Sequence, residues 1–407
     1  MADQRIPSHQ IFMGKTGLFP QEEMLEVGKK QGKLIIGIPK ESDKFENRVT
    51  LTPEAVELLV NNGHKVIIQS NAGKAANYFD KDYSENGGLI VENPASVYQA
   101  DIVLKVAPMT LEEIDMMPGN QTIITSFFFN ECTRTNIEKM MQKKITAIAS
   151  EDIKDINNSH PVLRSMSEIA GNTSVLIAAE YLSNVNNGKG VMLGGITGIT
   201  PTEVVILGAG TAGEYAARAA LGLGAFVKVM DSSIRRLREL QITLGRRLYT
   251  SVLHPQVIEK ALKSTDVLIG AMYINENKNN FFVTEEMVMG MKKGAVIVDI
   301  SIDQGGCIET SERRTHGNPI FTKHGVIHYC VPNIPSRVAR TASIALSNVF
   351  SPILISIGEA GGITHELKES PGLRHGVYLY NGILTNPYIG NKLGLPAKDI
   401  DLLMAAF

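Results

Sequence analysis

Short apolar runs alternate with amphipathic stretches through the first part of the chain. The runs are rich in β-branched residues, as in strands buried on both faces of a parallel sheet, and they occupy residues 34–38, 64–68, 102–106, 122–127 and 146–149. The stretches between them carry apolar residues at helical spacing, and one opens with Thr52 as N-cap and Pro53 at the first helical position. Strands separated by helices predict a first α/β domain with a parallel sheet.

The same alternation returns in the second half of the chain. Apolar runs there occupy residues 204–207, 225–230, 267–270, 295–300 and 326–331. A long helical stretch, which opens at Ser167 and is broken at Gly194, separates the two series. We therefore predict an α/β fold of two domains, each a parallel sheet with flanking helices, of which the second is a Rossmann sheet.

The two ends of the chain differ in pattern from these series. Residues 1–32 are polar and without a clear period, so we expect an N-terminal arm that ends in a short helix over 21–30. Residues 339–407 begin with a helical run and are too short to fold well alone. We predict that they return to the first domain, which residues 33–163 begin, while residues 164–338 form the second domain.

A glycine motif follows the first strand of the second domain. Gly208, Gly210 and Gly213 have G-x-G-x-x-G spacing, and Thr211 and Ala212 open the helix. Asp231 ends the next strand 18 residues after Gly213, close to the spacing expected for an acid on an adenosine ribose. The same residues could form a strand, turn and helix without a ligand. The acid and the order of the elements favour a dinucleotide, whose pyrophosphate would lie at the helix N-terminus.

Composition narrows the class of protein. The 407 residues are 43% apolar, with a net charge of −2, which predicts no attraction to nucleic acid or to an anionic membrane. Three cysteines without C-x-x-C spacing suggest neither a metal site nor a disulfide framework. We found no signal-peptide pattern and no run of about 18 apolar residues. These features predict a cytoplasmic protein with no metal, no nucleic-acid partner and no membrane partner.

Ligands of an open parallel sheet bind outside the carboxyl ends of its strands. Asp303 follows one such strand, beside Gln304 and two glycines, where it could exchange protons or orient a substrate amine. It could also simply cap a turn. Further cofactor-side candidates at these strand ends are Gly270, Ala271, Ile300, Val331 and Asn333. Arg236, close to Asp231, is another.

Two basic residues of the first domain are substrate-binding candidates. Arg48 follows the first strand and could bind a carboxylate through both arms of its guanidinium, or lie solvated on the surface. Lys105 lies within an apolar strand, where it either points into a cleft or extends to the surface at an edge.

From Lys33 onward the chain resembles the alanine dehydrogenase and transhydrogenase α-subunit family, and is closer to the dehydrogenases. The matching stretches are residues 37–41, 46–49 with 52–53, 104–106, 166–171, the glycine motif, 299–306 and 329–335. The resemblance implies two Rossmann-like domains, with the cofactor and the substrate in a cleft between them. It implies NAD and the reversible oxidative deamination of L-alanine to pyruvate. It also implies that Arg48 binds the substrate carboxylate, that Asp303 is the active-site aspartate, and that Ser167, Asp231 and Asn333 are cofactor-side residues. It further implies a homo-oligomer, a hexamer rather than a dimer.

The chain departs from this pattern in the first domain. The family's second lysine is missing from the segment that begins at Lys105, and Phe128 stands where the family has its catalytic histidine. An apolar Phe128 would suit a larger substrate side chain. The alternatives are therefore a dehydrogenase for another amino or keto acid, or a catalytically weakened NAD-binding regulatory protein. Loss of a general base costs roughly 10²–10⁴-fold in rate, so Asp303 is the remaining candidate for the base.

Overall fold

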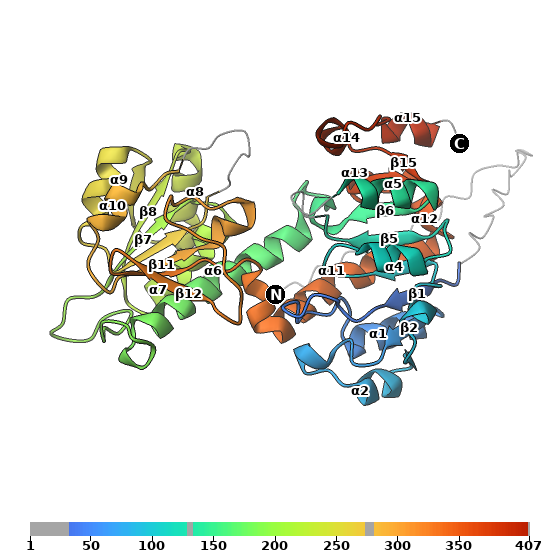
Figure 1. Cartoon of the computed structure of the whole chain (residues 1–407), viewed down its shortest axis with the longest axis horizontal. Helices are drawn as coiled ribbons and strands as arrows, with labels where there is room; N and C mark the ends of the chain where they lie inside the picture. Colours follow the sequence, from blue (N-terminus) through green and yellow to red (C-terminus); the bar gives the residue numbers. More distant parts are fainter. Residues whose placement is uncertain (1–31, 128–132, 273–280, 406–407) are drawn as a thin grey trace, which may run out of the picture.

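Two β-sheets with flanking helices make up the described residues, 32–127, 133–272 and 281–405, of this computed structural model (Figure 1). Each sheet is the centre of one domain. The chain passes from the first domain to the second through α6 (Pro161–Leu182) and returns through α11 (Ala339–Glu359). The expected α/β fold with two mostly parallel sheets is confirmed.

The first sheet has eight strands in the order β15-β14-β6-β5-β4-β1-β2-β3. Strands β1 to β6 are parallel, whereas β14 pairs antiparallel with β6 and β15. The C-terminal part of the chain therefore extends the first sheet. The bounds are β1 (Ile35–Ile38), β2 (Lys65–Gln69), β3 (Leu89–Val91), β4 (Ile102–Leu104), β5 (Thr122–Thr125), β6 (Thr146–Ala149), β14 (Val377–Tyr380) and β15 (Ile383–Leu384).

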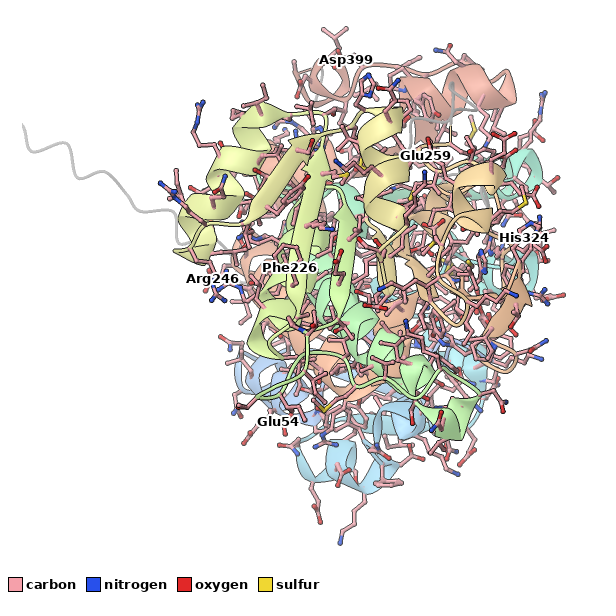
Figure 2. The ribbon with its side chains drawn as sticks, turned by 90° about the vertical axis from the view of Figure 1, so that its left-hand side faces the viewer. Glu54, Phe226, Arg246, Glu259, His324 and Asp399 are labelled. Carbon is pink, nitrogen blue, oxygen red and sulfur yellow. The ribbon has the colours of Figure 1, made fainter. Side chains whose placement is uncertain are left out.

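The second sheet has seven strands in the order β12-β13-β11-β10-β7-β8-β9, and only β12 is antiparallel. In Figure 2, Arg246, which precedes β9, and His324, which follows β12, lie at the two opposite edges of this sheet. The bounds are β7 (Glu203–Leu207), β8 (Phe226–Asp231), β9 (Tyr249–Val252), β10 (Val267–Gly270), β11 (Val296–Asp299), β12 (Ile320–Lys323) and β13 (Val326–Tyr329).

Helices connect the parallel strands. The remaining α-helices are α1 (Pro53–Asn61), α2 (Asp80–Glu85), α3 (Pro94–Val97), α4 (Leu111–Met116), α5 (Arg134–Gln142), α7 (Thr211–Gly222), α8 (Ile234–Leu244), α9 (Pro255–Leu262), α10 (Glu285–Met289), α12 (Ile363–Glu369), α13 (Pro371–His375), α14 (Pro387–Leu393) and α15 (Ile400–Ala405). Short 3₁₀ turns include η2 (Ser150–Asp152), η4 (Ile300–Gln304) and η5 (Ile334–Val338).

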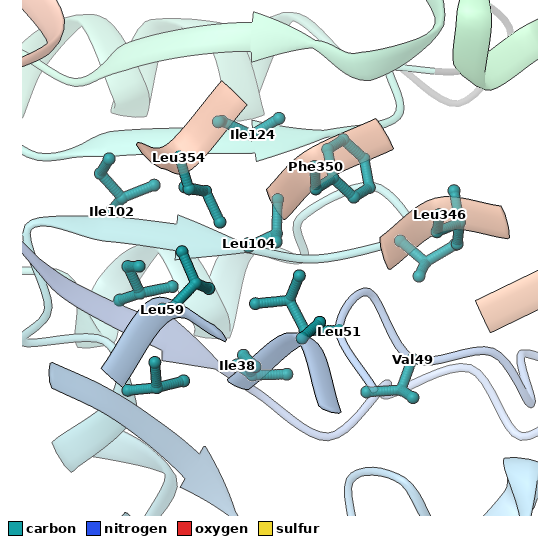
Figure 3. Packing of buried hydrophobic residues seen from close by; sticks show 14 of the residues in the cluster. Ile38, Val49, Leu51, Leu59, Ile102, Leu104, Ile124, Leu346, Phe350 and Leu354 are labelled. Carbon is teal, nitrogen blue, oxygen red and sulfur yellow. The ribbon is translucent and has the colours of Figure 1, made fainter. Parts of the chain in front are cut away.

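Helix α11 belongs to the core of the first domain. Leu346, Phe350 and Leu354 pack with Leu104 of β4 and Ile124 of β5 (Figure 3). Together with η5, α11 is long and apolar enough to cross a membrane, but half of its most apolar window is buried inside the protein. Its packing is that of a core helix in a globular domain.

The structure corrects several sequence-based expectations. Helix α6 begins at Pro161 rather than Ser167 and ends at Leu182, well before Gly194. Thr52 has the backbone conformation of an N-cap, but its side chain makes no capping hydrogen bond. Strands β3, β9 and β12 were not predicted, because they are short edge strands whose residues are mostly half-buried or exposed. The predicted helix at 21–30 lies outside the described residues.

Candidate active site at the domain junction

The glycine motif forms the turn between β7 and α7. Gly208 has a left-handed φ of 106°, which glycine adopts without strain. A Cβ on Gly213 would lie 1.9 Å from Gly208 O, so only glycine allows this close return of the helix. A Cβ on Gly210, by contrast, would meet nothing within 4 Å. The motif therefore leaves open space in front of the first N–H groups of α7, from Thr211, Ala212 and Gly213, as a pyrophosphate requires.

Helix α6 packs against this same helix start. A Cβ on Gly171 would lie 2.2 Å from Ala212 O, so the two helices touch at the first turn of α7. Ser167 lies one turn earlier on α6 and is half-buried. The arrangement places the predicted cofactor residue Ser167 on the helix that adjoins the glycine motif.

Asp231 is buried at the end of β8, and both of its carboxylate oxygens accept backbone hydrogen bonds. Oδ2 accepts from Ala209 N at 2.8 Å and Oδ1 from Ser233 N at 2.7 Å. The acid thus holds the glycine turn in place, and each oxygen keeps a lone pair for a ribose hydroxyl. Arg236 is exposed on the first turn of α8.

The other predicted cofactor-side residues lie at the carboxyl ends of β10, β11 and β13. Ala271 N donates to Leu207 O at 2.8 Å, and a Cβ on Gly208 would lie 2.3 Å from Ala271 O. A Cβ on Gly270 would lie 2.5 Å from Cys307 Sγ, which explains the glycine by packing alone. Ile300 is half-buried at the start of η4, and Val331 is buried after β13.

Arg48 is buried, not on the surface. Its Nε donates to Glu46 Oε1 at 2.7 Å and its Nη2 to Glu46 Oε2 at 2.5 Å, a bidentate ion pair. Its Nη1 lies 3.3 Å from Met166 Sδ on α6, which is a weak acceptor. The pair uses one side of the guanidinium and leaves N–H groups of Nη1 and Nη2 for another anion.

Asp303 and Asn333 of the second domain are linked by hydrogen bonds to Glu46, the partner of Arg48. Asn333 N donates to Asp303 Oδ1 at 3.0 Å, and Asn333 Nδ2 donates to Glu46 Oε2 at 2.7 Å. Asp303 is exposed at the domain junction, yet the surrounding protein removes enough hydration to raise its pKa to about 6. The Asn333 N–H and the charges of Arg313 and Arg48 oppose this shift. A carboxyl with this pKa can exchange a proton near neutral pH.

Lys105 is also fully buried, so it does not extend to the surface at an edge. Its Nζ donates to Glu41 Oε2 at 2.7 Å, to Ala107 O at 3.2 Å and to Pro108 O at 3.3 Å, and Glu113 lies 3.7 Å away. Burial opposes the charge on this ammonium, but Glu41 and Glu113 outweigh it and raise the pKa of Lys105. These acceptors match the three N–H groups of the ammonium. The predicted bond from Lys105 to substrate would therefore have to replace one of them.

Several acids at the junction were not singled out from the sequence. Glu41, Glu46 and Glu113 pair with the two buried bases, and Glu151 on η2 accepts from Phe127 N at 2.8 Å. Burial raises the pKa of Glu151 to about 7. Glu41 and Glu151 follow closely after a strand, and Glu46 lies beside Arg48, whereas Glu113 shows only the capping-box spacing with Thr110. Phe128 lies outside the described residues.

Histidines and metal ligands add little to this site. His328 is fully buried and bonds to Thr310 Oγ1 at 2.8 Å, as a core residue does. His316 Nε2 lies 3.2 Å from Asn333 O. Within the described ranges, no three His, Cys, Asp or Glu side chains are grouped to hold a metal ion.

Family models place the chain among known proteins. The N-terminal domain model of alanine dehydrogenase/PNT matches residues 37–170, and the C-terminal domain model matches residues 174–387. The chain belongs to the alanine dehydrogenase/PNT family. The resemblance inferred from the sequence motifs is thereby confirmed, and the boundary between the two family models falls inside α6.

Curated members of the family match over almost their full length. Alanine dehydrogenase of Staphylococcus saprophyticus is 40% identical over 370 residues, which is 90% of this chain and 99% of that protein. Alanine dehydrogenase 2 of Staphylococcus aureus is 38% identical over 368 residues, with 90% and 98% covered.

Solved structures of the family have the same fold. An L-alanine dehydrogenase superposes with a TM-score of 0.82 at 36% identity, covering 88% of this chain and 98% of that one. A transhydrogenase from Sinorhizobium meliloti has a TM-score of 0.74 at 24% identity, with 87% and 99% covered, and shares the fold.

Proposed function

We propose that this chain catalyses the reversible NAD-dependent oxidative deamination of L-alanine. The balanced reaction takes L-alanine, NAD⁺ and water to pyruvate, NADH, ammonium and a proton. The observation that carries the proposal is the hydrogen-bonded chain Arg48–Glu46–Asn333–Asp303, which joins a carboxylate-binding base of one domain to a proton acceptor of the other. The alanine dehydrogenase relatives, matched over 90% of this chain, support the same activity.

The residues take distinct roles in this reaction. The glycine turn and Asp231 would hold NAD, which would supply the hydride acceptor. Arg48 binds the substrate carboxylate through Nη1 and Nη2, because Glu46 already occupies the other side of its guanidinium. Asp303 removes protons from the amine and then from the water that adds to the iminium. Lys105 stabilises Glu41 and Glu113 in the core below the site.

A dehydrogenase for a larger amino acid is the second candidate. The segment after Lys105 lacks the second lysine, and the one lysine present has its donors filled by protein groups. A substrate site without that lysine has one fewer polar contact to select a small substrate. An NAD-binding regulatory protein is the remaining alternative, because the motif alone requires only cofactor binding.

A screen of the purified full chain separates the three. We expect NADH to appear with L-alanine at an ordinary enzyme rate of roughly 1–10³ per second, and to be consumed with pyruvate and ammonium. D-alanine serves as the matched control. A higher kcat/KM for another L-amino acid would support the second candidate. Tight NADH binding without turnover on any amino or keto acid would support an NAD-binding regulatory protein.

We also propose how the protein assembles and where it works. We expect a homo-oligomer, with a hexamer favoured, that works in the cytoplasm on small-molecule substrates. Support comes from apolar side chains exposed between α6 and β7, where Met192, Ile196 and Ile199 are 61%, 57% and 63% exposed. Neighbouring exposed apolar residues of this kind often form an interface.

A further inference from the structure

The Glu46 carboxylate accepts four hydrogen bonds at the domain junction. It lies in the loop between β1 and α1, and its side chain is only 2% exposed. Oε1 accepts from Arg48 N at 3.0 Å and from Arg48 Nε at 2.7 Å. Oε2 accepts from Arg48 Nη2 at 2.5 Å and from Asn333 Nδ2 at 2.7 Å. One buried carboxylate therefore bonds to both domains.

Asn333 extends this contact to Asp303. Its φ of 58° lies in the left-handed region, which asparagine tolerates better than most residues. In this conformation its backbone N–H reaches Asp303 while its side chain reaches Glu46. Only one residue thus separates the partner of Arg48 from Asp303.

A second set of hydrogen bonds fastens the same two segments. Asn47 N donates to Ser336 Oγ at 2.8 Å, and Ser336 Oγ donates to Phe45 O at 2.6 Å. Asn47 Nδ2 also donates to Ser336 O at 3.3 Å. Residues 45–48 of the first domain and 333–336 of the second are therefore fixed to each other on both sides of Glu46.

We propose that Glu46 is a positioning residue, which orients Arg48 for the substrate carboxylate and, through Asn333, couples Arg48 to Asp303 of the other domain. The inference rests on the proposed function and deepens it. Glu46 touches neither substrate nor cofactor in this scheme. It acts by fixing which N–H groups of Arg48 remain available and by holding the Asn333 N–H on Asp303.

The charge of Glu46 has a separate, measurable consequence. Burial alone would raise its pKa, but Arg48 and the Asn333 amide outweigh burial and keep Glu46 ionised. The charged groups that act on Asp303 are Arg313 and Arg48, which favour its ionised form, and Asp299, which opposes it. With the Glu46 charge removed, Arg48 would act on Asp303 uncompensated, and the pKa of Asp303 would fall.

The central test is Glu46→Gln in the full-length protein. Glutamine keeps the shape but places an NH₂ group against donors of Arg48 and Asn333. We expect KM for L-alanine to rise roughly ten- to hundredfold, as for other losses of a buried charged partner. We also expect the acidic limb of the kcat/KM profile to move to lower pH, with the affinity for NADH unchanged. Glu54→Gln, an exposed carboxylate on α1 (Figure 2), is the control.

Asn333→Gly isolates the link between the domains. Glycine keeps the left-handed backbone and its N–H but removes the amide that reaches Glu46. If Glu46 acts through Asn333, the two substitutions are non-additive in a double-mutant cycle of kcat/KM. Additive effects, or an unmoved pH profile in Glu46→Gln, would overturn the positioning role.

Amide hydrogen exchange gives a readout that needs no turnover. Both variants should increase exchange across residues 333–338, whereas Glu54→Gln should not. A parent protein without activity on any amino acid would reject the proposed function alone. Unchanged exchange across residues 333–338 in both variants would reject the coupling, whether or not the parent is active.

Discussion

At the scale of single residues, the buried charges show what a sequence can and cannot reveal. The sequence predicts Lys105 within an apolar strand, where burial of its charge is costly, and the structure instead places it directly after β4. Of its partners, Glu41 follows β1 and Glu113 lies on α4, and the sequence does not state how closely these segments approach β4. Arg48 and Glu46 are only two positions apart, yet their pairing depends on a loop that the domain junction shapes.

Lys105→Ala tests the buried ion pair. The substitution leaves Glu41 and Glu113 buried without a cation, and breaking such a pair typically costs about 3–5 kcal/mol. We expect the free energy of unfolding from urea titration to fall by about that amount. Lys81→Ala, which breaks an ion pair whose side chains are 80% and 63% exposed, should change it little. Equal stability of both variants would show that Lys105 contributes no net stabilisation.

Asp303 is expected to set the acidic limit of activity. Its pKa is raised to about 6, and the oxidative reaction needs the ionised form. The kcat/KM for L-alanine should therefore fall as pH drops through about 6, approaching tenfold per pH unit below it. Stopped assays from pH 5 to 9 measure this limb. Activity that stays level below pH 6 would assign the base to another group.

Asp303→Asn removes the base while keeping an acceptor for the Asn333 N–H. Turnover should fall by roughly 10²–10⁴-fold, whereas NADH affinity from fluorescence titration should remain near that of the parent. A variant with near-parent turnover would reject Asp303 as the base. Lost NADH binding would instead place Asp303 among residues needed for the cofactor.

At the scale of elements, the long apolar runs were the reliable signal. The ten interior strands expected from them are present, and most of their residues are buried. The start of α6 was placed too late, since Pro161 rather than Ser167 occupies the first helical position. The glycine turn was predictable in detail, since close approach and left-handed backbone restrict the residue type.

Gly210→Ala separates cofactor binding from folding at this turn. The added methyl meets no protein atom within 4 Å, and φ at this position is −81°, so folding should be unaffected. The methyl would occupy the space for a pyrophosphate, so the Kd for NADH should rise about tenfold or more. Gly222→Ala, at the end of the same helix and also in open space, is the control. Equal NADH affinity in both variants would place the phosphates elsewhere.

At the scale of the whole molecule, the two domains and the return of the C-terminal segment shape the site. The sequence predicted that residues 339–407 return to the first domain, and β14 does pair with β6. It did not predict that Asn333 would reach Glu46. Such contacts depend on how the domains meet, which periodicity along one chain does not specify. The residue roles in the site remain predictions.

The exposed apolar segment between α6 and β7 predicts assembly. A double substitution, Ile196→Glu with Ile199→Glu, places charges in the expected interface and should reduce the mass measured by light scattering after gel filtration. The control Ile242→Glu changes a residue that is 73% exposed on α8, outside this segment. Parent and double variant of equal mass would exclude this segment as an interface.

The antiparallel pairing of β14 with β6 bears on how the chain matures on the ribosome. All strands of the second sheet lie between Glu203 and Tyr329, so that sheet can form while the C-terminal segment is still being synthesised. The first sheet begins at Ile35 but needs Val377–Tyr380 for its β14 strand, and its core needs α11. Domains tend to fold as units during synthesis, the N-terminal one first. Here the domain that is translated first is the one completed last. The edge of β6 stays unpaired until β14, in the final part of the chain, has been synthesised.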